Sequence, residues 1–342
     1  MAGADPILSV LGELVVDLLP APGAPAGQHG TAPQYVARPG GNALNVAVAA
    51  ARLGVPVQLL ARLGTGPLAG HLRRHAEISG VDVAGFIEAD EPVSLAVVGL
   101  GPDGSPSYGF HVLGAADWQW TDEELAAVLP ESTGILHVGS ISSWTAPGSE
   151  AIARLVERVH AGGALVSVDP NIRPALADGP VGATLGNSAA VVRDRLERLI
   201  SRADVVKVSA EDLEWLEPEA VGSAEGLDVA AQRFAERGVA LVVLTDGGAP
   251  LRVARPGRPL LHREPPRVTV VDTVGAGDSL AAGLLGGLLA AGVSSRQALL
   301  DLPDDTLLAL IDDAALVAAI NCTRVGADPP TRAELDAARA AR

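Results

Sequence analysis

Hydrophobic positions along the chain follow two alternating patterns. Short continuous apolar runs, typical of strands buried on both faces, alternate with longer alanine- and leucine-rich segments that are typical of helices. This repeated order of strand and helix is expected for a parallel sheet with helices on its faces. The pattern predicts strands at 7–19, 57–61, 135–138, 165–168, 205–208, 241–244 and 268–271, and helices at 42–53, 67–79, 149–160, 193–201, 229–237, 279–291 and 331–342.

Two regions break this alternation. Residues 12–38 are rich in proline and glycine, and residues 92–113 alternate as a hairpin would around Asp103-Gly104. Together these regions can form a small antiparallel sheet over the main domain. The length of 342 residues allows one large α/β domain or two smaller ones.

Charge and cysteine content limit the classes of partner. The formal net charge of −16 argues against nucleic acid or an anionic membrane surface, because both bind positive charge. Cys322 is the only cysteine, which excludes an intrachain disulfide and fits a reducing compartment. The run 7–19 is interrupted by Glu13 and Asp17 and lacks a basic leader, and no segment approaches the roughly 18 apolar residues of a membrane helix. These features predict a soluble, cytoplasmic protein.

The run 271–280, Val-Asp-Thr-Val-Gly-Ala-Gly-Asp-Ser-Leu, carries the most chemical information. A glycine turn here joins an expected strand to an expected helix, so free backbone N–H groups and the helix dipole would attract an anion. Gly275 and Gly277 allow a ligand to approach closely, and Asp278 places a carboxylate on the same turn. This combination suits a reaction in which the carboxylate takes a proton while phosphate is transferred nearby. An ordinary helix N-cap is the alternative interpretation.

Other glycine patterns are weaker candidates for a nucleotide site. Residues 99–104 fit Gly-x-Gly-x-x-Gly, but no helix follows, so they predict a hairpin turn. The turns at 64–67 and 275–278 do not place the third glycine of a dinucleotide-binding loop. Lys207 is the only lysine and lacks the Gly-Lys-Ser/Thr context of a P-loop, which excludes P-loop nucleotide hydrolases.

Two further runs carry polar side chains in positions suited to a ligand. In 40–45, Gly-Gly-Asn-Ala-Leu-Asn, two glycines precede a helix whose first turn carries two amides, which suits a hydroxyl-rich ligand that Asp17 can also contact. The run 169–173, Asp-Pro-Asn-Ile-Arg, follows an expected strand at the end where open α/β sheets bind ligands, and Arg173 can meet phosphate with two hydrogen bonds. The alternatives are helix capping by Asn42 and a proline turn with a surface arginine.

With these runs together, the chain resembles the PfkB-type sugar kinases, the ribokinase family, from about residue 7 to about residue 335. The run 272–278 is similar to the C-terminal signature of that family, and 40–42 with 49–54 is similar to its N-terminal signature. The resemblance implies a single domain over 1–342. It would be a three-layer α/β/α ribokinase-like fold with a mainly parallel central sheet and a small β-sheet lid from about 12–38 and 92–113. Further local resemblance is to the fructokinase branch, at 136–140, 169–173, 206–209, 321–324 and 326–327.

The resemblance also implies transfer of the γ-phosphate of ATP to a sugar hydroxyl, with Asp278 as general base. We expect fructose, phosphorylated at its 6-hydroxyl. The alternatives are 2-keto-3-deoxygluconate, ribose or a nucleoside, and a non-catalytic sugar or nucleotide sensor on the same fold. By resemblance, Gly275, Ala276 and Gly277 form the anion hole, Arg173 approaches the sugar or the γ-phosphate, and the sugar is held by Asp17, Gly40, Gly41, Asn42 and Asn45.

The nucleotide and cation sites are likewise implied by the resemblance. Mg²⁺ would accompany ATP, organised by Asp212 or by the adjacent Glu211. A site for a monovalent cation such as K⁺ would involve Asp272, Val274 and Gly326. Lid sheets in this family can pair across a dimer, so a homodimer through the lid is expected. The residues implied at the nucleotide are Lys207, Ser209, Thr245, Gly247, Gly275, Gly277 and Asn321.

Overall fold

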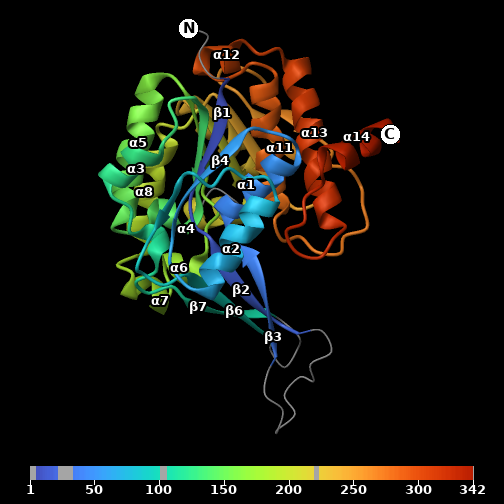
Figure 1. Cartoon of the computed structure of the whole chain (residues 1–342). Helices are drawn as coiled ribbons and strands as arrows, with labels where there is room; N and C mark the ends of the chain where they lie inside the picture. The colour runs from blue at the N-terminus through green and yellow to red at the C-terminus, as the bar shows by residue number, and fades with distance from the viewer. Residues whose placement is uncertain (1–4, 22–33, 101–105, 219–222, 342) are drawn as a thin grey trace.

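A nine-stranded sheet runs through the centre of the computed structural model, which describes residues 5–21, 34–100, 106–218 and 223–341 (Figure 1). The strand order is β13-β12-β11-β10-β9-β8-β1-β4-β5. Neighbouring strands from β11 to β5 are parallel, and β12 and β13 continue the sheet antiparallel at one edge. The strands are β1 (Ile7–Leu11), β4 (Val57–Leu63), β5 (Phe86–Glu88), β8 (Thr133–Gly139), β9 (Leu165–Asp169), β10 (Val205–Ser209), β11 (Leu241–Thr245), β12 (Leu251–Ala254) and β13 (Leu261–Arg263).

Helices cover both faces of this sheet, and each face has its own apolar core. The side chains of α1, α2, α11, α12, α13 and α14 pack on one face, and those of α3, α4, α5, α6, α8, α9 and α10 pack on the other (Figure 1). The alternation of strands and helices predicted a sheet with helices on its faces, and the resemblance implied a three-layer α/β/α fold. Both are therefore confirmed. The helices on the first face are α1 (Asn42–Arg52), α2 (Pro67–Ile78), α11 (Ala276–Ala290), α12 (Arg296–Asp301), α13 (Asp304–Cys322) and α14 (Arg332–Ala340). The others are the 3₁₀ helix η1 (Ala116–Trp118), α3 (Asp122–Val128), α4 (Ser140–Trp144), α5 (Gly148–Gly162), α6 (Pro174–Ala177), α7 (Pro180–Thr184), α8 (Ala189–Ile200), α9 (Ala210–Leu216) and α10 (Ala224–Glu236).

A second sheet of four strands, called the lid sheet here, projects from the main body (Figure 1). Its order is β3-β2-β6-β7, formed by β2 (Val15–Pro20), β3 (Tyr35–Gly40), β6 (Ser94–Leu100) and β7 (Pro106–His111). The expected antiparallel pairing is wrong for β2 and β6, which are parallel. The reason is that β2 follows β1 and β6 follows β5, and both preceding strands run in the same direction through the main sheet. The predicted turn at Asp103-Gly104 lies outside the described residues.

Three sequence predictions of secondary structure need correction. The run 7–19 is not one strand, because the chain leaves the main sheet after Leu11 and enters the lid sheet at Val15. The expected strand at 268–271 is wrong: this segment lies outside both sheets, and Val270 is 59% exposed. The longest helix in the described part of the chain, α13, was not predicted, because apolar residues occur on most of its sides and leave no amphipathic signal.

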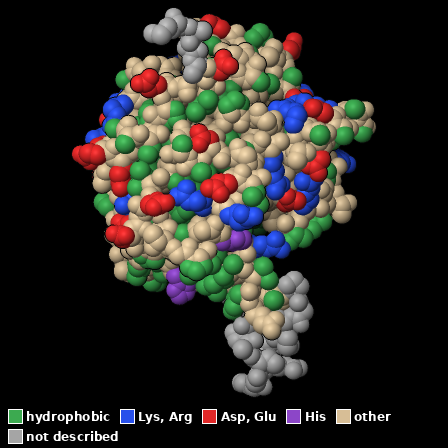
Figure 2. All heavy atoms as spheres, in the orientation of Figure 1, with side chains coloured by type: hydrophobic (Ala, Val, Ile, Leu, Met, Phe, Trp, Pro, Cys, Tyr) green, Lys and Arg blue, Asp and Glu red, His purple; other side chains and the backbone are tan. Residues whose placement is uncertain are grey.

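Charged side chains of both signs occur on the surface of the described residues. On the face drawn in Figure 2, acidic and basic side chains are interspersed and form no continuous basic patch among the described residues. Within the same described ranges, no helix is long and apolar enough to cross a bilayer.

Candidate functional site

The polar residues singled out by the sequence gather where the carboxyl ends of the central strands face the lid sheet. Asp278 lies in the first turn of α11 and is only 7% exposed. Nδ2 of Asn42 donates to its Oδ1 at 2.7 Å, and Nδ2 of Asn45 donates to its Oδ2 at 2.8 Å. The N-terminal and C-terminal glycine runs therefore meet at one carboxylate, although 236 residues separate Asn42 from Asp278.

A third amide reaches the same carboxylate from the end of β9. Nδ2 of Asn171 lies 3.4 Å from Oδ1 of Asp278. Asn171 has φ 39°, a left-handed conformation that is uncommon outside glycine and is often found at functional sites. Arg173 is the residue of this run that the sequence predicted for the site, and Asn171 was not predicted. An asparagine directly after a strand-terminal Asp-Pro pair is the signal that could have identified it, because asparagine tolerates this conformation better than most residues.

The glycine turn before Asp278 is packed tightly on both sides. Gly275 is the N-cap of α11 with φ 74°, and a Cβ atom there would lie 2.6 Å from Cβ of Ala327. A Cβ atom on Gly277 would lie 2.7 Å from Nζ of Lys207. The N–H of Ala276 donates to the carbonyl of Thr273 at 3.2 Å. The N–H groups that follow it belong to the first turn of α11, where backbone donors have no partner within the helix.

The end of α13 holds the segment that leads into this turn. Asn321 is fully buried, and its Nδ2 donates to the carbonyl of Val274 at 2.8 Å. The carboxylate of Asp272 accepts N–H bonds from Val274 at 3.0 Å and from Gly326 at 2.8 Å. The three residues expected at a monovalent cation thus lie together. Asn321, which was expected near the adenine, is a buried anchor of the turn in this structure.

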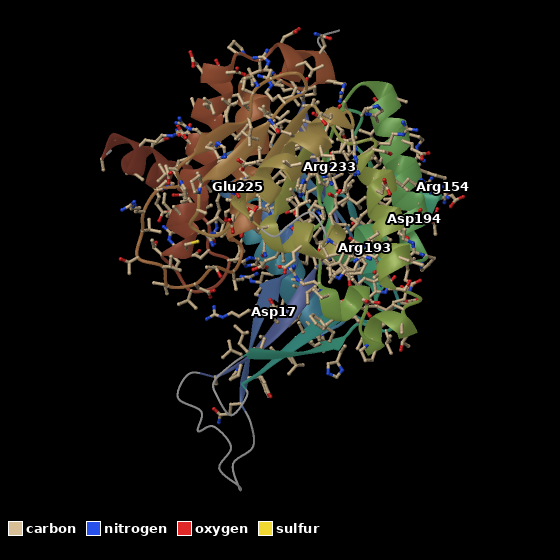
Figure 3. All side chains as sticks on the ribbon, turned by 180° about the vertical axis from the view of Figure 1, so that it is seen from behind. Asp17, Arg154, Arg193, Asp194, Glu225 and Arg233 are labelled. Carbon is tan, nitrogen blue, oxygen red and sulfur yellow. The ribbon has the colours of Figure 1, made fainter. Side chains whose placement is uncertain are left out.

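The residues expected at the sugar come from β2, β3 and the start of α1. A Cβ atom on Gly40 would overlap the carboxylate of Asp17, and Gly41 has φ 103° at the start of α1. Asp17 lies on the lid sheet close to the main body (Figure 3). Burial raises the pKa of its carboxyl to about 6, an effect that the positive charge of Arg173 opposes. Arg173 is exposed and donates to the backbone carbonyls of Asn171 and Ile172 and to the side-chain oxygen of Asn171.

The residues expected at the nucleotide and Mg²⁺ do not form one cluster of side chains. Ser209 and Thr245 are register partners at the ends of β10 and β11, and Gly247 follows two residues later with φ 52°. The carboxylate of Asp212 accepts N–H bonds from Ile172 at 2.7 Å and from Ser209 at 3.0 Å. Glu211, by contrast, is exposed. In the described ranges no group of three or more His, Cys, Asp or Glu side chains is arranged to hold a metal ion.

Lys207 differs most from its expected place. The residue is only 5% exposed, and its Nζ lies 3.1 Å from Oδ2 of Asp169, behind the glycine turn. Asp169 itself is fully buried, and burial raises the pKa of its carboxyl to about 6 against the opposing charge of Lys207. The expected direct contact of Lys207 with a nucleotide stays a prediction, and the ion pair with Asp169 was not foreseen.

Comparison with known proteins matches both the sequence and the fold. The model of the "pfkB family carbohydrate kinase" matches residues 7–334. A fructokinase of Klebsiella pneumoniae is 33% identical over 309 residues, which cover 90% of this chain and 89% of the relative. The fructokinase of Xylella fastidiosa with bound ATP superposes with a TM-score of 0.82 at 28% identity, covering 98% of this chain and 99% of the other. The fructokinase of Vibrio cholerae O395 with fructose, ADP and calcium ion gives a TM-score of 0.77 at 28% identity, covering 98% and 99%.

Proposed function

The chain belongs to the pfkB family of carbohydrate kinases, and from that premise we propose that it transfers the γ-phosphate of ATP to the 6-hydroxyl of fructose. The observation that carries the proposal is Asp278, a nearly buried carboxylate at a helix N-terminus that is held by Asn42 and Asn45. Its place beside backbone donors lets one turn both accept a proton and stabilise an anion. The fructokinase names of the relatives support the choice of sugar.

The reaction begins with the sugar between the lid sheet and α11. Asp17 and Asn45 orient its hydroxyls, and Arg173 adds a positive charge at the same edge. Asp278 takes the proton of the 6-hydroxyl as that oxygen attacks the γ-phosphorus. The bond from the γ-phosphorus to the bridging oxygen breaks, which leaves ADP and fructose 6-phosphate. Backbone N–H groups of the turn at 275–278 face the charge that develops on the phosphoryl oxygens.

Apolar residues near the turn suit the base of the nucleotide. Val271, Val274 and Val325 are 56%, 49% and 71% exposed. The hydrogen bonds of Asp272 to Val274 and Gly326 hold these valines in one region. We assign this region to the adenine, with Thr245 and Gly247 on the phosphate side.

The choice between Asp212 and Glu211 for Mg²⁺ follows from which carboxylate is free. Mg²⁺, when bound with ATP, neutralises charge on the β- and γ-phosphates. The carboxylate of Asp212 accepts hydrogen bonds from Ile172 and Ser209. The side chain of Glu211 is exposed and makes no hydrogen bond within the described part of the chain, so we assign the Mg²⁺ role to Glu211. For K⁺ we propose Asp272, Val274 and Gly326, which the hydrogen bonds of Asp272 bring together. A cytoplasmic location and a homodimer through the lid sheet stay predictions.

A coupled ADP-release screen over hexoses, pentoses, keto-deoxy acids and nucleosides tests the proposal. We expect the highest kcat/KM with fructose. Replacing the proposed base in Asp278→Asn should lower kcat by about 10²–10⁴-fold. Asp301→Asn, which alters an exposed carboxylate on α12 bonded to Gln297, should leave kcat unchanged. Wild-type turnover by Asp278→Asn would refute the mechanism, and a clear preference for another compound would refute the choice of fructose.

A further inference from the structure

Lys207 is a buried cation in an apolar face of the main sheet. Val206 and Val208 on either side of it belong to one core, and Val205 belongs to the other, so Lys207 points to the face that α11 covers. A charged ammonium at such a place is unfavourable, because burial removes its water and the N-terminus of α11 carries partial positive charge. Its presence therefore calls for a compensating interaction.

Three carboxylates supply that compensation. Asp169 on β9 is the direct partner of the ammonium, with its Oδ2 3.1 Å from Nζ. Asp212 on α9 and Asp278 on α11 attract the same charge from farther away, and the three together raise the pKa of Lys207 although burial opposes them. The ring of His137 on β8 is also near the ammonium and is fully buried. Burial, together with the charge of Lys207, lowers the pKa of this ring to about 3. The imidazole is therefore neutral, and Lys207 is the only cation in this group.

The ammonium lies directly against the turn that precedes Asp278. A Cβ atom on Gly277 would lie 2.7 Å from Nζ and 3.3 Å from Cε of Lys207, so the lysine occupies the space that any other residue at 277 would need. Asp278 follows in the chain, and its carboxylate is among the groups that interact with the ammonium. A purely structural ion pair with Asp169 would not require this position behind the turn.

We propose that Lys207 is a positioning residue whose buried ammonium, fixed by Asp169 behind Gly277, holds a positive charge beside the carboxylate of Asp278 and stabilises the negative charge of the phosphoryl group at the turn. This inference rests on the proposed function. Lys207 then acts by its charge from behind the backbone of Gly277 and does not contact the nucleotide directly. The charge is fixed before any ligand arrives, which is the condition under which electrostatic stabilisation is most effective.

The first experiment uses the fact that Lys207 is the only lysine. Labelling with lysine that carries ¹⁵N at the ε-amino group gives one side-chain signal in the NMR spectrum of the full chain. We expect this signal to shift in Asp278→Asn and to stay in place in Asp301→Asn, both recorded at pH 8. An unchanged signal in Asp278→Asn would overturn the proposal. This readout does not depend on catalysis, so it separates the proposal from the identity of the substrate.

The second experiment compares the pH profile of kcat in wild type and Lys207→Met. We expect kcat to fall about 10²-fold or more, as for loss of one preorganised electrostatic group, and the acid limb to move to higher pH, with KM for fructose within about threefold of wild type. Arg255→Met is the control, because Arg255 is also a buried cation but contacts the α12–α13 region. It should destabilise the protein without moving the acid limb.

A folded Lys207→Met with the wild-type acid limb would overturn the proposal. If that variant fails to fold, the NMR comparison decides. Absence of kinase activity in wild type with every sugar would refute the proposed function alone.

Discussion

The carboxyl of Asp17 should make sugar binding depend on pH in the range just below neutrality. Its pKa is raised to about 6 because the side chain is half-buried where the lid sheet meets the main body, and Arg173 limits the rise. An ionised carboxylate accepts hydrogen bonds from sugar hydroxyls at both oxygens, whereas a protonated one loses part of that capacity. Sugar affinity should therefore be full above about pH 7 and decrease as the pH falls through 6.

The size of the effect follows from the titration alone. Each pH unit below the pKa reduces the ionised fraction about tenfold, equivalent to about 1.4 kcal/mol of binding free energy. If only the ionised form binds, the Kd for fructose should rise about tenfold between pH 8 and pH 5. Isothermal titration calorimetry without nucleotide measures this Kd and leaves out any contribution of the chemical step.

Asp17→Asn is the matched variant, since it keeps the shape of the side chain and removes its titration. We expect it to bind fructose weakly at pH 8 and with the same Kd at pH 5. A wild-type Kd that is constant over this range would refute the reasoning, and so would an Asp17→Asn variant that retained the wild-type slope.

Three further changes test other parts of the structure. Gly275→Ala puts Cβ 2.6 Å from Cβ of Ala327 at φ 74°, so kcat should fall at least tenfold at saturating substrate. Burial raises the pKa of Asp117 from 3.8 to about 7, so wild type should lose unfolding free energy relative to Asp117→Asn as the pH rises from 4 to 7, by up to about 1.4 kcal/mol per unit in urea titrations. Asn321→Ala frees the carbonyl of Val274 and should lower the free energy of unfolding by about 1–3 kcal/mol and raise KM for ATP; unchanged values would contradict the anchoring role.

The main sheet could be predicted because its strands are buried on both faces. Runs such as 205–208 are then apolar with few interruptions, and length and flanking residues identify them. The same rule failed at 268–271, where four consecutive residues also look like a strand. That segment is bound instead at one point, by the N–H of Val271 to the carbonyl of Cys322 at 2.8 Å. Local pattern carries no information about such a distant partner.

The members of the candidate site could be predicted, but not the contacts among them. Asn42 and Asn45 stood out as two amides in one run, and Asp278 stood out as a carboxylate on a glycine turn in another. Their hydrogen bonds span more than 230 residues and depend on α1 packing beside α11. Lys207 shows the same limit, because its strand was predicted while its burial against Gly277 depends on how the sheet meets α11.

The glycines of both runs have a role that sequence reasoning only half described. Gly275 and Gly277 were expected to let a ligand approach the backbone, and Gly40 and Gly41 were expected to precede a helix that carries two amides. In the structure, Gly40 leaves space for the carboxylate of Asp17, and Gly277 leaves space for the ammonium of Lys207. The missing side chains thus admit charged groups of the chain itself. The Cβ atom added in Gly277→Ala would displace the ammonium of Lys207. The effect of this variant on the pH profile of kcat should therefore resemble that of Lys207→Met. If Gly277 served only to leave room for the ligand, Gly277→Ala would change KM and leave the acid limb of the pH profile unchanged.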